Sequence, residues 1–157
     1  MNGKALVPLG RDMRDIVAYL AFLSIGIPVG AQMEGQGLAR LKPLEGDLQR
    51  GVAIIASTCA RCHGANGQGT ALAPPLWGAH SYNLGAGMAN IITAASFIHA
   101  LMPIDGAQRL TEQQAFDVAT YINTRPRPDF SGKVHDWPKG GKPAGFEYHI
   151  SKEDLND

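Results

Sequence analysis

This chain has no excess of charge of either sign, because 14 lysines and arginines balance 14 aspartates and glutamates. Without a basic cluster there is no field to hold a phosphate backbone, so nucleic-acid binding is not expected. Charged residues are also few, at 18%, whereas apolar residues reach 45%, which excludes wholesale disorder. With 157 residues, the chain is long enough for one modest domain with appendages and too short for two complete domains.

Aromatic side chains and cysteines are scarce as well. Aromatic residues make up only 7%, whereas the chain has 19 glycines and 10 prolines. This composition predicts long irregular connections and a core that a large non-protein group helps to fill. Only two cysteines occur, and both lie in the six residues from Thr58 to His63. Any cysteine chemistry therefore belongs to that one place.

The most apolar stretch, residues 16–31, is too short to span a bilayer, and we expect no stable membrane insertion. Residues 1–31 resemble a secretory signal in their basic start and small-residue end, but Asp12 and Asp15 stand where such signals usually carry no acid. We favour the alternative, a folded helix that Asp12 caps and that ends near Gly26.

In the next part of the chain, the sequence pattern predicts a linker followed by two helices. Residues 32–46 are rich in glycine and polar side chains and are expected to be the linker. A helix then runs from Asp47 directly into Cys59. After a loop rich in glycine and proline, a helical pattern resumes over residues 88–101.

The most strongly marked helix begins at the capping box from Thr111 to Gln114 and ends at Pro126. Residues 127–157 have no usable period, and we expect an irregular tail that its aromatic side chains pack on the domain. Part of this helix is also repeated earlier in the chain, because residues 117–121 (DVATY) resemble residues 15–19 (DIVAY). This pair of similar segments is called the sequence echo. Two copies of one terminal helix indicate two domains of one kind, of which the first is mostly missing.

Cys59-Ala60-Arg61-Cys62-His63 has the spacing of a haem attachment site. Two intervening residues place both thiols on one helical turn, where the sulfurs can add across the two vinyl groups of the haem. The histidine that follows is then placed beneath the iron as its proximal ligand. We therefore predict one covalent haem c held by Cys59 and Cys62, with His63 bound to the iron.

Two other kinds of site use similar residues. A thioredoxin-like dithiol expects a strand before it and a parallel sheet around it, but an amphipathic helix precedes Cys59 and no β-rich run is visible. A structural zinc site needs about four ligands, and the adjacent Cys62 and His63 cannot easily both bind one tetrahedral ion. Covalent haem is therefore the interpretation that fits this motif best.

The iron needs a second ligand unless that position is open. Met102 is the first candidate, because it stands in a loop just past one helix, where its thioether can fold over the distal face. His/Met ligation raises the reduction potential and leaves no vacant position, so such a haem transfers electrons and does not bind substrate. The alternative ligands are Met88, His80, His99, His135 and His149.

The segment from Pro74 to Gly78 follows the attachment motif. A prolyl carbonyl there can accept the proton of the proximal imidazole, and we assign Pro75 to the cofactor site. Trp77 is a further candidate, which either packs on the macrocycle or donates its indole proton to a propionate. A rigid turn is the purely structural alternative, and it is compatible with these roles.

In their order along the chain, these motifs resemble class I c-type cytochromes from about Asp47 to Pro126. The resemblance implies an all-α, class I cytochrome c fold with four to five helices around one covalent haem, long irregular loops and a C-terminal tail. Members of the class usually carry an aromatic residue where Ile55 stands, which implies a different packing at the helix crossing. The resemblance is carried by Gly51, Ile54-Ile55, Cys59 to Gly64, Pro74 to Leu76, Met102-Pro103 and the helix to Tyr121.

A narrower resemblance, over nearly the whole chain, is to the second haem domain of dihaem thiosulfate dehydrogenases. Residues 1–31 resemble the end of the first haem domain of that family. There the first haem carries a cysteine thiolate and is where thiosulfate is coupled to tetrathionate. This chain has one attachment motif and no spare cysteine, which implies that the catalytic half is absent. The narrower resemblance is carried by Pro74 to Gly78, Ser81 to Asn83, Gly85 to Met88, Phe97-Ile98, Met102-Pro103, Ala115 to Ala119, Arg125 to Pro128, Asp136 to Pro138 and Gly140 to Pro143.

We therefore expect residues 47–126 to form a periplasmic cytochrome domain that transfers single electrons, in the oxidation of sulfur compounds such as thiosulfate. The location follows because haem attachment of this type is completed outside the bacterial cytoplasm. The expected partners are redox donor and acceptor proteins held in small, short-lived contacts. A fragment of a thiosulfate dehydrogenase is the alternative, so enzyme activity stays open. A ligand-sensing haem with five-coordinate iron is a third possibility.

Overall fold

The computed structural model describes residues 6–31 and 37–148. The chain divides into two compact units, Met1–Gln36 and Gly37–Asp157. In the described residues every regular element is helical, and the only β-type pairing is one isolated bridge between Asn90 and Phe146. The predicted all-α class is therefore confirmed. No helix in this part of the chain is both long and apolar enough to cross a membrane.

The first unit contains helix α1 (Arg11–Leu23). Its N-cap is Gly10, and no side chain caps it. The prediction that Asp12 caps this helix is wrong, since Asp12 lies in the first turn, where its charge favours the positive end of the helix dipole. No residue of α1 is buried. Its large apolar side chains are instead exposed, among them Ile16, Val17, Tyr19, Leu20, Phe22 and Leu23.

The first helical stretch of the second unit leads into the attachment motif. It comprises α2 (Leu48–Ile54), the π-helical segment η1 (Ile55–Cys59) and α3 (Ala60–His63). Asp47 caps it, because its carboxylate accepts from the backbone amide of Arg50 at 2.8 Å. Gly64 ends it with a φ of 81°, a value that glycine adopts without strain. The predicted helix from Asp47 into Cys59 is therefore confirmed.

Helix α4 (Ile91–Leu101) starts three residues later than the sequence predicts. Asn90 caps it by accepting from the amides of Ile92 and Thr93, at 3.0 and 3.1 Å. The three residues before Asn90 form a short 3-10 turn, η2 (Gly87–Ala89). Met88 therefore lies in this turn, outside the helix.

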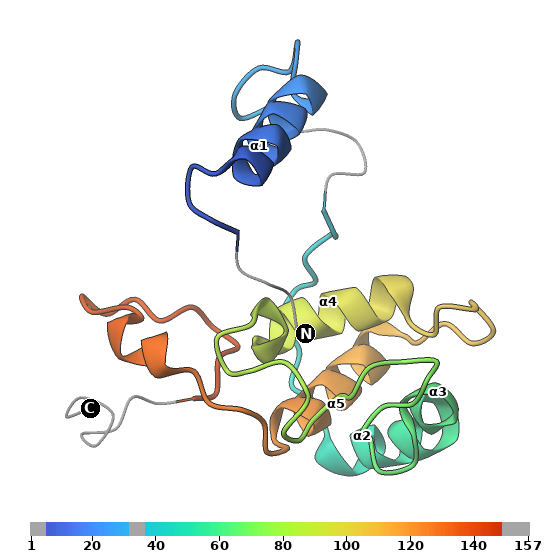
Figure 1. The fold of residues 1–157 in the computed structure, drawn as a ribbon. Helices are drawn as coiled ribbons and strands as arrows, with labels where there is room; N and C mark the ends of the chain where they lie inside the picture. The colour runs from blue at the N-terminus through green and yellow to red at the C-terminus, as the bar shows by residue number, and fades with distance from the viewer. Residues whose placement is uncertain (1–5, 32–36, 149–157) are drawn as a thin grey trace. The chain divides into compact units, whose positions relative to one another are not determined.

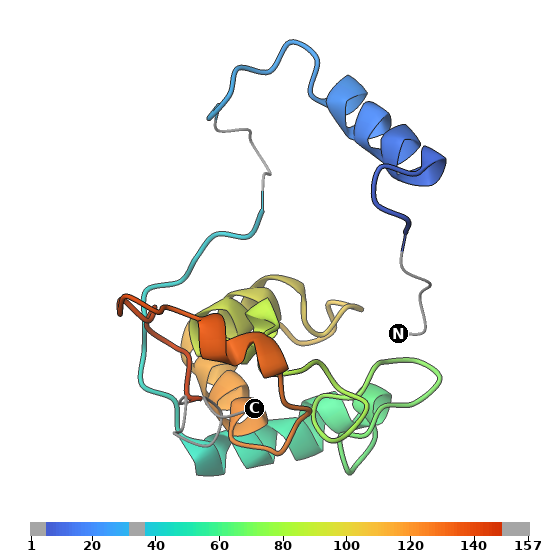
Figure 2. The same ribbon diagram turned by 60° about the vertical axis from the view of Figure 1, so that its left-hand side comes forward.

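Helix α5 (Glu112–Asn123) starts at the predicted capping box, which is complete. The Thr111 hydroxyl accepts from the Gln114 amide, and the Gln114 side chain accepts from the Thr111 amide. Figures 1 and 2 both show α5 between α4 and the helical stretch that begins with α2. The core lies at these two contacts and includes Ile55, Ile92, Ala95, Ile98, Ala115, Phe116, Val118, Ala119 and Ile122.

The crossing of α2 and α5 depends on Gly51. A Cβ atom at this position would lie 2.3 Å from the carbonyl oxygen of Asp117 and 2.9 Å from Cβ of Tyr121. Only glycine lets the two backbones approach this closely. Ile55, one turn further along, is only 4% exposed and belongs to the same core.

A buried carboxylate joins the same two helices. Asp117 on α5 is fully buried and accepts from Arg50 Nε at 2.8 Å, from the Asp47 amide at 2.8 Å and from Gln113 Nε2 at 2.9 Å. Burial alone would raise the pKa of Asp117, but these donors outweigh it and lower the pKa. Asp117 therefore stays charged and fixes the first turn of α2 against α5.

The segment after α5 returns to the start of α4. It contains the 3-10 turn η3 (Ser131–His135). The Ile91 amide donates to the Gly145 carbonyl at 2.8 Å, and Asn90 Nδ2 donates to the Ala144 carbonyl at 2.7 Å. The rings of Trp137, Phe146 and Tyr148 pack together with centroids 5.2–5.7 Å apart. Residues 144–146 are thus held on the domain by backbone pairing.

We expect Asp117→Asn to lower the free energy of unfolding at neutral pH by about 1–3 kcal/mol, because Arg50 loses its counter-charge. The loss stays moderate because Arg50 is half-exposed and water can still solvate its charge. The folded-state pKa of Asp117 lies below the unfolded value, so its stabilisation is complete above the unfolded pKa. That stabilisation is lost as the pH falls through the folded pKa. The difference between the two proteins should therefore shrink in acid, which urea unfolding at several pH values measures.

Asp15→Asn is the matched control. Asp15 is the counterpart of Asp117 in the sequence echo, and its ion pair with Arg11 is exposed on both sides, at 3.8 Å. Such pairs contribute little, so this variant should unfold almost like the parent protein. Equal losses in the two variants would contradict the role assigned to the buried carboxylate.

Candidate functional site

The attachment motif lies at the end of the first helical stretch of the second unit. Cys59 ends η1, and Cys62 and His63 lie in α3. Both cysteines are free thiols of intermediate exposure, and Cys59 packs against the apolar core. Burial, together with the neighbouring Cys62, raises the pKa of Cys59 to about 11. At neutral pH this thiol is therefore protonated and faces apolar surroundings.

These properties differ from those of the two competing kinds of site. A redox-active dithiol requires a thiol with a lowered pKa, whereas that of Cys59 is raised. The two cysteines also follow a helix, where a thioredoxin-like site would follow a strand. Within residues 6–31 and 37–148, no three side chains of His, Cys, Asp or Glu gather in a way that could hold a metal ion.

The His63 ring is oriented by the loop that follows it. Its Nδ1 lies 2.7 Å from the carbonyl oxygen of Pro74. A carbonyl can only accept, so Nδ1 carries a proton, and in the neutral ring the lone pair then lies on Nε2, where a metal can bind. The prediction of a prolyl carbonyl in this role agrees with the geometry, but the acceptor is Pro74, while Pro75 makes no such bond in the described structure. The sequence pattern did not distinguish adjacent prolines.

Trp77 fixes the same loop to the end of α5. Its side chain is 8% exposed and meets the Tyr121 ring edge-on, with centroids 5.8 Å apart, and the Arg125 guanidinium lies 5.7 Å from the Trp77 ring. A Cβ atom at position 67 would lie 2.2 Å from the indole, so only glycine fits where the backbone passes Trp77. Contact of Trp77 with a macrocycle or a propionate stays a prediction.

Met102 stands where the sequence places it, directly after α4. It is the C-cap residue, and its amide donates to the Ile98 carbonyl at 3.0 Å. Its side chain is partly buried against the core, as is that of Met88. The Met88 carbonyl accepts from Asn123 Nδ2 at 3.2 Å, which ties its turn to α5. Met102 instead begins the long connection from α4 to α5.

The alternative histidines lie in varied places. His80 and His135 are exposed, and His149 lies outside the described residues. His99 is partly buried, and its Nδ1 donates to the Leu110 carbonyl at 2.9 Å. This bond uses one ring nitrogen of His99 to fasten the connection that Met102 begins.

One pair of residues near the motif was missed in the sequence. Arg61, between the two cysteines, forms an ion pair with Asp105, three residues after Met102. Opposite charges in these two segments were the available signal, but nothing in the sequence alone shows that the segments meet.

The donor set fits a covalently attached haem. Two free thiols stand on one helical turn, and the next residue is an imidazole whose tautomer leaves Nε2 free. Two thioethers, those of Met88 and Met102, lie partly buried against the same core. Sulfur and imidazole donors of this kind are those that haem c uses.

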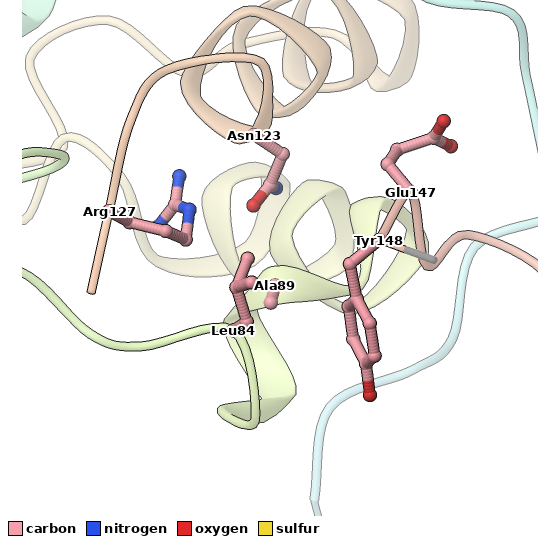
Figure 3. A pocket seen from close by; sticks show the side chains of 6 residues that line it. All are labelled: Leu84, Ala89, Asn123, Arg127, Glu147 and Tyr148. Atoms are coloured by element: carbon pink, nitrogen blue, oxygen red, sulfur yellow. The ribbon is translucent and has the colours of Figure 1, made fainter. Parts of the chain in front are cut away.

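A separate cavity of about 170 Å³ lies beside the end of α5. Figure 3 shows Asn123 and Arg127 facing Leu84 and Ala89 across it, with Glu147 and Tyr148 at one side. The Arg127 guanidinium lies 4.2 Å from the Tyr82 ring and donates to the Ile122 carbonyl. None of the residues assigned to haem binding lines this cavity, so the candidate haem site lies elsewhere.

Comparison with known proteins identifies relatives of this arrangement. The family model described as cytochrome c matches residues 48–126. The chain is 41% identical over 150 residues to a thiosulfate dehydrogenase of Psychrobacter arcticus, covering 91% of this chain and 46% of the relative. It is also 41% identical over 143 residues to a thiosulfate dehydrogenase of Allochromatium vinosum, covering 87% of this chain and 53% of the relative. The chain thus spans about half the length of these relatives.

A solved structure agrees with these matches. The thiosulfate dehydrogenase TsdBA of Marichromatium purpuratum superposes with a TM-score of 0.74 and 41% sequence identity, covering 92% of this chain and 33% of that one. The matched family segment contains the capped helix of α2, the attachment motif, Met102 and all of α5. On these grounds, this chain belongs to the cytochrome c family.

Proposed function

We propose that this chain is a periplasmic electron-transfer cytochrome that carries one haem c. In this proposal Cys59 and Cys62 hold the haem through thioether bonds, and His63 and Met102 bind the iron. The observation that carries the proposal is the hydrogen bond from His63 Nδ1 to the Pro74 carbonyl, directly after two free thiols on one helical turn. That bond sets the ring in the tautomer that an iron ligand needs.

The residues of the site are proposed to have separate roles. When bound, the haem supplies one-electron exchange at its iron. The Pro74 carbonyl increases the basicity of His63 and fixes its ring. The soft thioether of Met102 favours ferrous iron and raises the reduction potential. If His63 and Met102 both bind the iron, no position would be left for a substrate, which is why electron transfer is proposed over ligand sensing.

The location and partners are inferred from the same chemistry. Attachment of haem to two cysteines in this way is completed outside the bacterial cytoplasm, so a periplasmic protein is proposed. The partners are proposed to be redox donor and acceptor proteins that bind through small, short-lived contacts. Because the relatives are named thiosulfate dehydrogenases, the donor system is proposed to oxidise thiosulfate.

A second candidate function is supported by α1. Ile16 and Val17 are 46% and 56% exposed, whereas their counterparts in the echo, Val118 and Ala119, are 1% and 0% exposed. The same sequence pattern is thus covered in α5 and uncovered in α1. This supports residues 1–31 as the last helix of a neighbouring cytochrome domain, joined by residues 32–46.

In that arrangement, residues 47–126 are the electron-exit domain of a thiosulfate dehydrogenase, and residues 127–157 are its tail. The conversion of thiosulfate to tetrathionate then belongs to the neighbouring domain, since the one cysteine pair of this chain is used for haem attachment. We propose electron transfer as the function of this chain and keep membership in a thiosulfate dehydrogenase as the second candidate.

Replacing Met102 tests the distal ligand. In the haem-loaded protein, Met102→Ala should lower the midpoint potential by on the order of 0.1–0.3 V, because the iron loses its thioether. The same variant should lose the far-red sulfur-to-iron charge-transfer band of the oxidised protein. Met88→Ala is the matched control and should retain the band. The reverse pattern would assign the ligand to Met88.

Removal of both thiols tests covalent attachment. In the variant with Cys59→Ser and Cys62→Ser, denaturing acid should extract the haem completely, whereas the parent protein should keep its haem on the chain. Each single variant retains one thiol and should keep the haem through one thioether. Haem that stays on the chain of the double variant after extraction would contradict the attachment.

Adding thiosulfate tests whether this chain transfers electrons without oxidising thiosulfate itself. Added to the oxidised haem-loaded protein, thiosulfate alone should leave the haem absorbance unchanged, because no vacant iron position is available to it. A substoichiometric amount of the Psychrobacter arcticus enzyme should then allow reduction. Formation of tetrathionate by this chain alone would contradict both candidate functions, because neither assigns that conversion to this chain.

A further inference from the structure

The connection from α4 to α5, residues 102–110, is here called the distal loop. It is fastened to α4 at its far end by two hydrogen bonds. Arg109 Nη1 donates to the Ala100 carbonyl at 2.6 Å, and His99 Nδ1 donates to the Leu110 carbonyl at 2.9 Å. The middle of the loop has no such support from α4, and Ile104 there is 87% exposed.

The middle of the distal loop is a tight turn that starts directly after Met102. The Gly106 amide donates to the Pro103 carbonyl at 2.9 Å, and Gly106 has a φ of 65°. Within the turn, Asp105 Oδ1 accepts from the Ala107 amide at 3.1 Å. This bond orients the carboxylate and leaves Oδ2 for a partner outside the loop. A movement of Asp105 is therefore passed along a short closed turn to Met102.

The partner of Asp105 lies in the attachment motif. Arg61 Nη2 contacts Asp105 Oδ2, and the two side chains are 49% and 45% exposed. Within residues 6–31 and 37–148, no other hydrogen bond or ion pair joins residues 103–109 to residues 59–63. The pair thus connects the segment that holds both thiols to the segment that carries the distal methionine.

We propose that the Arg61–Asp105 ion pair positions the distal loop and controls how readily Met102 leaves the iron. This inference rests on the proposed function, since it takes His63 and Met102 as the ligands. In this proposal, withdrawal of the Met102 sulfur shifts the turn that follows Met102, and the ion pair, which joins that turn to Arg61 of α3, resists the shift. Because the pair is half-exposed, it restrains the loop weakly, so Arg61 and Asp105 tune ligand release without preventing it.

The test measures imidazole binding to the oxidised, haem-loaded protein. Imidazole displaces the methionine, and at high imidazole concentration the rate is limited by release of Met102. We expect Asp105→Asn and Arg61→Gln each to increase this limiting rate by about two- to fivefold, in keeping with the small energy of an exposed pair. The double variant should be no faster than the single variants, because both remove one interaction.

Two further measurements separate positioning from general loosening. Exchanging the charges, with Arg61→Asp and Asp105→Arg together, should slow release again relative to the single variants, because it restores the ion pair although the Ala107 amide loses its carboxylate acceptor. Added salt should accelerate the parent protein toward the variants and leave the neutral double variant unchanged. Asp12→Asn removes an exposed carboxylate in the first unit and should leave the rate as in the parent protein.

The outcomes separate this inference from the proposed function. Unchanged rates in both single variants, with the far-red band present in all proteins, would overturn the role of the ion pair and leave Met102 ligation standing. Absence of the band from the parent protein would overturn Met102 ligation, and this inference with it. Faster release with the band retained at rest, reversed by the charge exchange, supports the inference.

Discussion

The contact on which the rest of this structure depends is the crossing of α2 and α5. At Gly51 the two backbones come so close that no Cβ fits, and next to it the buried Asp117 carboxylate binds Arg50 and the capped start of α2. Both the close approach at Gly51 and the bonds of Asp117 fix α2, the helix that continues into the attachment motif. Cys59, Cys62 and His63 therefore take their position from a contact about two to three helical turns earlier in the same helical stretch.

From that crossing, each side of the candidate site is built separately. The proposed proximal side is local in sequence, because His63 ends α3 and the loop that follows it carries Pro74 and Trp77, of which Trp77 packs on Tyr121 of α5. The proposed distal side comes from a different connection, which starts at Met102 and ends at the capping box of α5. The two sides therefore come from separate segments of the chain, and the Arg61–Asp105 ion pair joins these segments.

Features with a local cause were predictable from the sequence. The capping box at Thr111 needs only residues three apart, and the spacing of Cys59, Cys62 and His63 needs only one helical turn. The start of α4 was missed because Asn90 is a better cap than anything at Met88, and apolar spacing does not reveal caps. The choice of Pro74 over Pro75 depends on the path of the loop, and the ion pair joins residues 44 positions apart. Neither follows from spacing.

The π-helical segment Ile55–Cys59 has a consequence for how this helix tolerates change in length. A π turn behaves as one residue inserted into an α-helix, and it offsets everything after it by about 100° around the axis. Gly51 faces α5 on one side of the segment, and the cysteines and histidine follow on the other. Deletion of Ala56 or Ser57 would leave an uninterrupted α-helix that still carries Gly51, Ile55, Cys59, Cys62 and His63. It would also rotate Cys59, Cys62 and His63 about the helix axis relative to Gly51, so the segment sets the angle between the end of the helix that packs on α5 and the end that carries the attachment motif.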